Sequence, residues 1–405
     1  MDIRIDRRDL LLGLLGSGLA VTAPRVAYAR VPDDRRFIFI LLRGGMDGLS
    51  AVPPVGDRDY AALRGALAIA PVGKADGALG LDDRFGLHPA LAPIHGLWSK
   101  GELAIVHAAA TPYRERSHFD AQNVLETGGN APSHDGIGWL NRAIGLMRQD
   151  GAPRGRDLGL AVNEAAPLVM AGPARVATWA GPGGGAPPTD YLLDAVDRLY
   201  ADSPRFHAAL ATARDTRALL AASEDGMAGK EPGQSRLIPV FGGLATLMRA
   251  EGGPRIATLE VTGWDTHTGQ GAVMGKFGKL LGQFADALAE LRRGLGPAWA
   301  RTVVVAATEF GRTAVPNGTG GTDHGTAGAA FVLGGAVAGG RMIADWPGLS
   351  PQRLYQGRDL APTTDLRGVF AGVLRDHLGL PAADIRRQIF SDAADLAFVP
   401  GLTRG

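Results

Sequence analysis

The chain alternates short apolar runs with amphipathic stretches. Five runs are almost continuously apolar, at residues 37–42, 102–108, 255–261, 302–307 and 329–335. Runs of this kind are typical of strands that are buried on both faces of a sheet. Helical periodicity follows the second run, at 118–128, and precedes the fourth, at 274–295, where apolar side chains recur on one face. This order predicts an α/β fold with a largely parallel sheet.

The middle of the chain, residues 151–234, departs from this pattern. It contains the stretch AGPGGGAPP at 180–188, followed by a long helical stretch. Glycine and proline in such density indicate a connector without regular structure. We therefore expect a single α/β domain over 30–405, in which 151–234 forms a cap or an insertion.

The first 29 residues have the pattern of an export signal. Arg7 and Arg8 precede an apolar run at 10–21, and the stretch ends in the small-x-small sequence Ala27-Tyr28-Ala29. The apolar run is shorter than a membrane span needs, and paired arginines are typical of the twin-arginine route. We expect a periplasmic or secreted protein without a transmembrane anchor after cleavage, whose partners include the twin-arginine machinery and signal peptidase. An amphipathic N-terminal helix is the alternative.

Composition limits the chemistry. The chain is 45% hydrophobic and 20% charged, as in a globular protein, and its net charge of +1 gives no electrostatic reason to expect nucleic acid as a partner. None of the 405 residues is cysteine, which excludes disulfides, cysteine-type zinc sites and a cysteine nucleophile. Any metal must therefore be bound by histidine, carboxylate or hydroxyl groups.

Polar residues with metal-binding or catalytic chemistry lie next to all five apolar runs. Ligands of open α/β sheets bind beyond the carboxyl ends of the strands, so these loops are expected to meet. The candidates, in chain order, are Asp47, Ser117, His118, Asp265, His267, Glu309, Arg312, Asp323 and His324.

Two sets of metal ligands can be built from these candidates. Asp265 and His267, two residues apart in an extended segment, point to the same side and with His324 form a carboxylate–imidazole set suited to Zn, Mn or Fe. Asp323 lies beside His324 and is a further candidate ligand. A harder oxygen set suited to Mn, Mg or Ca would come from Asp47 and Glu309, with Ser117 as a possible third member. We therefore expect one or two divalent metals.

Each candidate also has a structural explanation. Asp47 lies between glycines and could be a turn residue. Ser117 is a good helix N-cap, although a helix N-terminus also suits a nucleophile. Arg312 could form a surface ion pair or bind an anionic group in bidentate fashion. The other histidines are interpreted as structural, with His88 and His134 as the strongest exceptions because both lie in loops.

The motifs LLRGGMDGLS, ERSHFDAQNVLETG, GWDTH and TEFGRT…GTDHG, together with the leader, resemble the exported bacterial family named domain of unknown function 1501. That family is similar to the alkaline phosphatase and sulfatase superfamily. The resemblance implies an alkaline-phosphatase-like three-layer sandwich with a central, mostly parallel sheet flanked by helices. It also implies one or two metals at the strand ends and phosphoryl or sulfuryl transfer through a hydroxyl nucleophile.

The resemblance also assigns roles by position. Asp47 resembles the aspartate that binds one metal, and Ser117 lies near the position of the nucleophile. Asp265, His267 and His324 resemble the ligands of the other metal. Glu309 takes the place of the first residue in an Asp-His pair.

The sequence departs from that superfamily at three points. Phe310 follows Glu309 where the superfamily has histidine, so one nitrogen ligand is lost. The spacing between Asp265 and His267 is shorter than usual. The sulfatase motif begins with Cys or Ser, whereas the nearest match here begins with Ala110, so no formylglycine can form and an ordinary sulfatase is not expected.

The sequence thus favours an exported metal-dependent hydrolase of small anionic esters, with phosphate esters ahead of sulfate esters. Ser117 or water would attack, His118 would act as acid/base or as an additional ligand, and Arg43 or Arg312 would orient the substrate oxygens. Two alternatives stay open: an inactive binding or assembly protein that keeps the fold and a structural metal, and another metal-dependent hydrolase that acts on extracellular polymers or sugar esters.

Overall fold

The computed structural model describes residues 34–149, 158–182, 196–198, 210, 214 and 236–404. The export signal expected at 1–29 and most of the helical stretch expected after residue 188 lie outside the described residues. Within the described residues, no helix combines the length and the apolar character needed to cross a bilayer.

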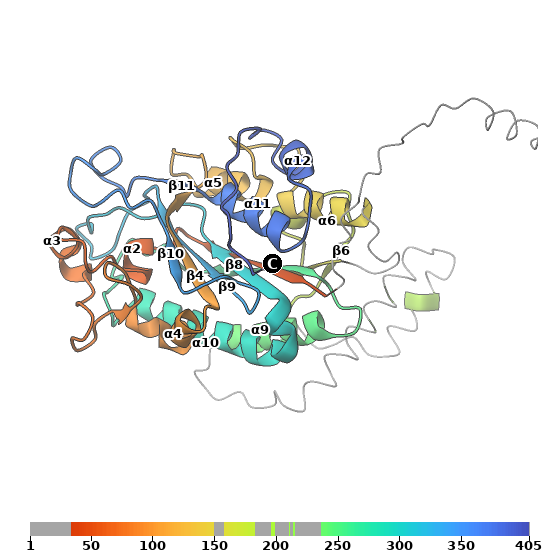
Figure 1. Ribbon diagram of the computed structural model, residues 1–405, viewed down its shortest axis with the longest axis horizontal. Helices are drawn as coiled ribbons and strands as arrows, with labels where there is room; N and C mark the ends of the chain where they lie inside the picture. Colours follow the sequence, from red (N-terminus) through yellow and green to blue (C-terminus); the bar gives the residue numbers. More distant parts are fainter. Residues whose placement is uncertain are drawn as a thin grey trace, which may run out of the picture.

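A central, mostly parallel sheet organises the described part of the chain (Figure 1). Its nine strands are β1 (Arg36–Arg43), β4 (Leu103–Ala110), β5 (Gly159–Val162), β6 (Val176–Thr178), β7 (Ile256–Thr262), β8 (Thr302–Ala307), β9 (Gly328–Leu333), β10 (Arg341–Ile343) and β11 (Thr364–Asp365). They follow the order β10-β4-β9-β8-β1-β7-β5-β6, and β11 also pairs with β4. All five strands expected from the apolar runs are present.

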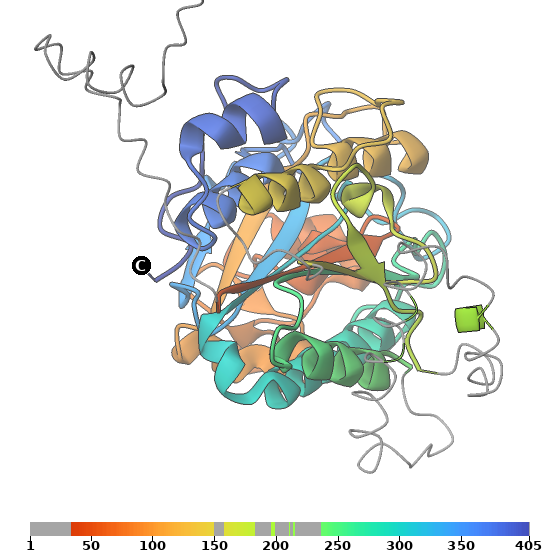
Figure 2. The same cartoon turned by 90° about the vertical axis from the view of Figure 1, so that its right-hand side faces the viewer.

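Helices cover both faces of this sheet (Figures 1 and 2). One layer contains α5 (His118–Thr127), α6 (Trp139–Gln149), α11 (Leu366–Asp376) and α12 (Ala382–Asp384). The opposite layer contains α4 (Ala92–Ser99), α9 (Leu237–Arg249) and α10 (Lys276–Leu295). The predicted three-layer α/β sandwich is therefore confirmed, as are the helices expected at 118–128 and 274–295.

Shorter elements complete the described fold. Two short helices, α2 (Gly48–Ala51) and α3 (Tyr60–Arg64), follow β1, and β2 (Leu79–Gly80) pairs with β3 (Gly86–Leu87). Short 3-10 turns lie at Gly65–Leu67, Pro89–Leu91, Leu168–Met170 and Gly296–Arg301, and a π-helical turn at Ile385–Ile389.

The strands are apolar throughout because each face of the sheet has its own core. Along β1, Phe37, Phe39 and Leu41 belong to one buried cluster, and the alternate residues belong to the other. Trp139 of α6 stacks on Phe370 of α11 at 4.7 Å between ring centroids in the first cluster. Successive strand side chains point to opposite faces, so a strand buried on both sides has no polar alternation.

Two strands of the sheet, of which β6 is an edge strand, fall within 151–234, the stretch in which the sequence predicts a cap or insertion. β5 pairs with β7, and β6 pairs with β5, both in parallel. These two short strands are therefore part of the central sheet. With four and three residues, β5 and β6 are shorter than the apolar runs that indicate the central strands.

The direction of β9 places the loop that precedes it at the same edge of the sheet as the loops of the candidate site. β9 is antiparallel to both of its neighbours, β4 and β8, whereas the other strand pairs of this sheet are parallel. The start of β9 consequently lies at the edge where β8 ends. The loop at 308–327 therefore shares this edge with the loops that follow β1, β4 and β7.

A buried histidine makes the stability of this fold sensitive to acid. His377 is 1% exposed, its Nε2 is 2.9 Å from the carbonyl oxygen of Arg36, and burial lowers its pKa to about 4. In the unfolded chain histidine takes up a proton near pH 6.5, while the folded chain resists it until about pH 4. The free energy of unfolding should therefore fall by up to about 3 kcal/mol through His377 as the pH drops across this window.

A His377→Gln variant isolates this contribution, because glutamine keeps an N–H donor for Arg36 and cannot titrate. Urea unfolding at pH 7 and at pH 4.5 should show a smaller loss of stability for the variant than for the unchanged chain. Equal losses in the two proteins would show that His377 titrates normally in the fold.

Candidate metal centre

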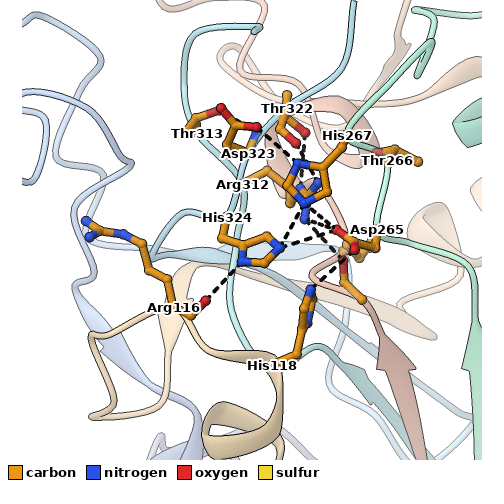
Figure 3. A network of polar contacts seen from close by, with 12 residues as sticks. Arg116, His118, Asp265, Thr266, His267, Arg312, Thr313, Thr322, Asp323 and His324 are labelled. Carbon is orange, nitrogen blue, oxygen red and sulfur yellow. Dashed lines mark hydrogen bonds and ion pairs between the residues drawn. The ribbon is translucent and has the colours of Figure 1, made fainter. Parts of the chain in front are cut away.

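Four side chains from three loops converge at this edge of the sheet (Figure 3). The contacting atoms of His118, Asp265 and His324 lie within 4.8 Å of one another. Nε2 of His267 lies 3.1 Å from Oδ1 of Asp265 and 2.9 Å from Nε2 of His324. His118 opens α5 after β4, Asp265 and His267 follow β7, and His324 precedes β9. The structure thus brings together three imidazoles and one carboxylate.

The second nitrogen of each imidazole faces an oxygen acceptor. These Nδ1 contacts are His118 with Oε1 of Glu309 at 2.7 Å, His267 with Oδ1 of Asp323 at 3.0 Å, and His324 with the carbonyl of Arg116 at 2.9 Å. A carbonyl accepts only, and so does an ionised carboxylate, so each Nδ1 is assigned the proton. In the neutral rings, each Nε2 then carries a lone pair.

This assignment leaves the Nε2 lone pairs without donors. Those of His267 and His324 face each other at 2.9 Å. Nε2 of His118 is buried, with no hydrogen-bond partner in the described structure. Opposed lone pairs repel unless a proton or a metal cation lies between them. Imidazoles whose Nδ1–H groups are held by carboxylates or carbonyls are typical of metal ligands, so the donor set fits a metal cation.

The types of donor restrict the metal. Three imidazole nitrogens and one carboxylate suit Zn, Mn or Fe better than Mg or Ca, which prefer oxygen ligands. The side chains of Asp265 and His267 are 43% and 41% exposed. A cation bound there would be open to solvent on that side, as in sites where water or substrate completes the coordination.

Arg312 fixes the carboxylate of Asp265. Its buried guanidinium donates to Oδ1 of Asp265 at 2.7 Å and to Thr322 at its hydroxyl and its carbonyl, at 3.2 and 2.5 Å. Partial burial acts to raise the pKa of Asp265, but the hydrogen bond and charge of Arg312 lower it overall. The carboxylate is therefore ionised and oriented, as a ligand must be.

Glu309 lies behind His118 rather than in the ligand cluster. Besides facing His118, its carboxylate accepts from Gly44 N–H at 2.9 Å, Gln122 at 3.0 Å and Thr308 at 2.9 Å. Burial alone would raise its pKa, but these hydrogen bonds, led by the one from His118, lower it. In turn, the hydrogen bond to Glu309 raises the pKa of His118. Glu309 thus orients the ring of His118.

Asp323 orients His267 in a similar way. It accepts from Asn317 Nδ2 at 3.0 Å on the oxygen that also faces His267. The hydrogen bond from Asn317 and then that from His267 lower the pKa of Asp323. Glu309 and Asp323, both predicted as metal ligands, are therefore placed by the structure at the Nδ1 side of two histidines.

Two glycines allow the loops to approach this closely. Gly44 has φ +118°, and a Cβ on it would lie 2.6 Å from the backbone nitrogen of Asp265. A Cβ on Gly321 would lie 2.3 Å from the carbonyl carbon of His267. A side chain at either position would push the loop after β7 away from its neighbour.

The structure places Asp47 in a separate, buried network. Asp47 caps α2 and pairs with Arg64, and its Oδ2 accepts from Ser50 Oγ at 2.8 Å and Gln270 Nε2 at 2.7 Å. Its oxygens are therefore already occupied, as are those of Glu309. The second, oxygen-rich metal set expected from the sequence does not assemble among the described residues.

Ser117 and Arg43 also contact protein groups. Ser117 is the N-cap of α5, and its Oγ lies 3.5 Å from the backbone N–H of Asp120. Nη2 of Arg43 lies between Oε1 of Glu126, at 2.8 Å, and Oε1 of Glu260, at 2.6 Å. In the structure, Ser117 therefore caps a helix, and Arg43 forms ion pairs with two carboxylates. Arg312 forms an ion pair with Asp265.

Three further residues, none of them predicted as a functional residue, support the cluster. Phe310 is buried, and its ring packs on the rings of His118 and His324, with centroids 4.7 and 5.0 Å away. It thus supports two histidines of the cluster. Gln122 and Asn317 are ordinary polar residues whose roles appear only once the loops are folded. Of the two exceptional histidines, His88 is buried among backbone partners and His134 is exposed.

Fold and site together define a three-layer α/β protein with a histidine–aspartate cluster at the strand ends. The chain belongs to the family described as protein of unknown function (DUF1501), whose model matches residues 34–389. No curated protein matches the sequence. The family assignment made from the motifs is therefore confirmed.

Proposed function

We propose that this protein is a metal-dependent hydrolase of small anionic esters, with phosphate esters as the first choice. The observation that carries the proposal is the convergence of three imidazole Nε2 atoms on Asp265, with every Nδ1 held by an acceptor. A divalent cation in such a set supplies Lewis acidity and makes water a good nucleophile near neutral pH.

The charges of the site favour an anionic substrate. Three carboxylates, those of Asp265, Glu309 and Asp323, lie in or beside the cluster, and two guanidinium groups, those of Arg312 and Arg358, lie next to it. Histidines that bind a cation through Nε2 are neutral and add no charge. A divalent cation would therefore bring the balance to one net positive charge, which attracts a phosphate or sulfate group.

The exposure of the cluster supports turnover over a structural role for the metal. Structural sites are closed to solvent, whereas catalytic sites keep a position for water or substrate, which four protein ligands leave as a fifth position on the exposed side. Here the Asp265 and His267 side chains are more than one third exposed. This observation favours a hydrolase over the inactive binding protein that the sequence leaves as an alternative.

The residues of the chain then have distinct tasks. Glu309, Asp323 and the Arg116 carbonyl hold the three Nδ1–H groups, and Arg312 keeps the Asp265 carboxylate ionised. Ser117 stays at the start of its helix, so we assign the attack to water rather than to a serine hydroxyl. Arg358 donates one N–H to the His324 carbonyl at 2.8 Å and is 42% exposed, which makes it our candidate for contacting the substrate anion.

The proposal is tested by assaying the metal-loaded protein against aryl phosphate mono- and diesters. We expect metal-dependent hydrolysis that a Ser117→Ala variant retains, with kcat/KM within about twofold of the unchanged chain and a stability loss of about 1 kcal/mol from the missing helix cap. Loss of hydrolysis in the folded variant would indicate attack by Ser117. No hydrolysis of any ester by a metal-loaded protein would contradict the proposed function.

A further inference from the structure

The acceptor that faces Nδ1 of His324 differs in kind from those of the other two histidines. His118 and His267 face carboxylate side chains, whereas Nδ1 of His324 faces the backbone carbonyl of Arg116 at 2.9 Å (Figure 3). A hydrogen bond to a ligand's second nitrogen orients the ring only if the acceptor itself is fixed. The position of His324 therefore depends on what fixes the backbone of Arg116.

The backbone of Arg116 is in a conformation that needs support. Its φ is +61°, in the left-handed region that residues with a side chain rarely adopt. The guanidinium is anchored to the Oδ2 of Asp359, with Nε at 2.9 Å and Nη2 at 2.7 Å. Nη2 also donates to Oε1 of Gln356 at 2.7 Å, and Gln356 itself has φ +54°. Residues in such conformations persist where surrounding contacts hold them, often at functional sites.

Asp359, which anchors the side chain of Arg116, is itself held in place by several contacts. It is 0% exposed, and its Oδ2 also accepts from the hydroxyl of Thr326 at 2.8 Å. Its backbone forms isolated bridges with Thr313 and Tyr355. The neighbouring Arg358 donates to the carbonyl of His324 at 2.8 Å. The turn at 355–359 therefore contacts His324 directly through the side chain of Arg358 and indirectly through Arg116.

We propose that Asp359 is a positioning residue of the metal centre. By anchoring Arg116 it fixes the carbonyl that holds the Nδ1–H of His324, and so keeps Nε2 of His324 directed at the cation. Asp359 itself does not contact the cation. The inference rests on the metal centre on which the proposed function also rests, but its test measures metal binding and does not need hydrolysis.

The test uses Asp359→Asn in the full chain, with Co²⁺ as the probe. Competition titration should show Co²⁺ affinity about tenfold weaker or more, the usual effect of removing an outer-shell partner. The visible absorption bands of bound Co²⁺ should also change, because the donor set becomes less well oriented. The matched control is Asp365→Asn, which weakens another aspartate–arginine pair, to Arg367 at 2.7 Å. It should lower stability without changing Co²⁺ affinity.

A second variant keeps the inference testable if Asp359→Asn does not fold. Arg116→Lys retains the positive charge, but an ammonium lacks the planar fork that reaches both Asp359 and Gln356. We expect a smaller loss of Co²⁺ affinity in the same direction. Folded variants with unchanged affinity and spectrum would overturn the positioning role. An unchanged chain that binds no Co²⁺ would overturn it together with the metal centre, whereas one that binds Co²⁺ and hydrolyses no ester would remove only the proposed function.

Discussion

A His267→Ala variant is expected to bind Zn²⁺ at least about a hundredfold more weakly than the unchanged chain. Binding free energies of four-ligand zinc sites reach about 10–16 kcal/mol, so one ligand accounts for roughly 3 kcal/mol, or about two orders of magnitude in Kd. The side chain of His267 is 41% exposed, so its truncation should cost the fold little stability. Competition with a chromophoric chelator measures the two affinities.

The matched control for this experiment is His134→Ala. His134 is exposed and lies in a loop outside the cluster, so its removal should leave the Zn²⁺ affinity unchanged. A His267→Ala protein that keeps the Zn²⁺ affinity of the unchanged chain would show that His267 is not a ligand. Equal losses in both would indicate non-specific binding to surface histidines.

Replacing Arg64 by methionine is expected to destabilise the fold by about 3–5 kcal/mol without removing the metal. Arg64 and Asp47 are 0% and 1% exposed and form a buried ion pair. Removing one partner leaves the other charge buried without its counter-ion, which is costly. Arg64 also donates to the carbonyl oxygens of Thr313 and Ala314, both at 3.2 Å. Urea unfolding gives the loss of stability, and elemental analysis of the folded variant gives the metal content.

This prediction also separates the two roles considered for Asp47. If Asp47 acts through its ion pair and its cap of α2, replacing both partners, Asp47→Asn with Arg64→Met, should recover part of the lost stability. A folded Arg64→Met protein of near-normal stability that has lost its metal would instead place Asp47 in the metal centre, as the sequence suggests.

Much of the fold could be predicted because its strands are buried on both faces. Runs such as TVVVAA have no polar alternation, so they indicate central strands without any knowledge of their neighbours. The strands β5, β6, β10 and β11 have two to four residues each, which is too short for such a pattern. The antiparallel direction of β9 could not be predicted from the sequence either, because the direction of a strand depends on its pairing partner and not on its own residues.

Part of the site could also be predicted, because its residues follow or precede strands that the sequence identifies. The rule that ligands gather beyond strand ends brought His118, Asp265, His267 and His324 into one set of candidates. Residue type could not separate a member of the histidine–aspartate cluster from a residue that orients it: Glu309 is a carboxylate at a strand end like Asp265, but it contacts the Nδ1 of His118. Asp359 lies 243 residues along the chain from Arg116 and Arg64 lies 17 residues from Asp47, and no motif marks either pair.

The central claim is that the histidine–aspartate cluster binds a cation. The most direct test is elemental analysis of the folded protein, purified without chelator or affinity tag, beside a His324→Ala variant. The account predicts about one equivalent of a transition metal in the unchanged chain, as expected for a single four-ligand site, and its loss in the variant. An unchanged chain that contains no metal, takes up none when Zn²⁺ is added, and is as stable as the variant would contradict it.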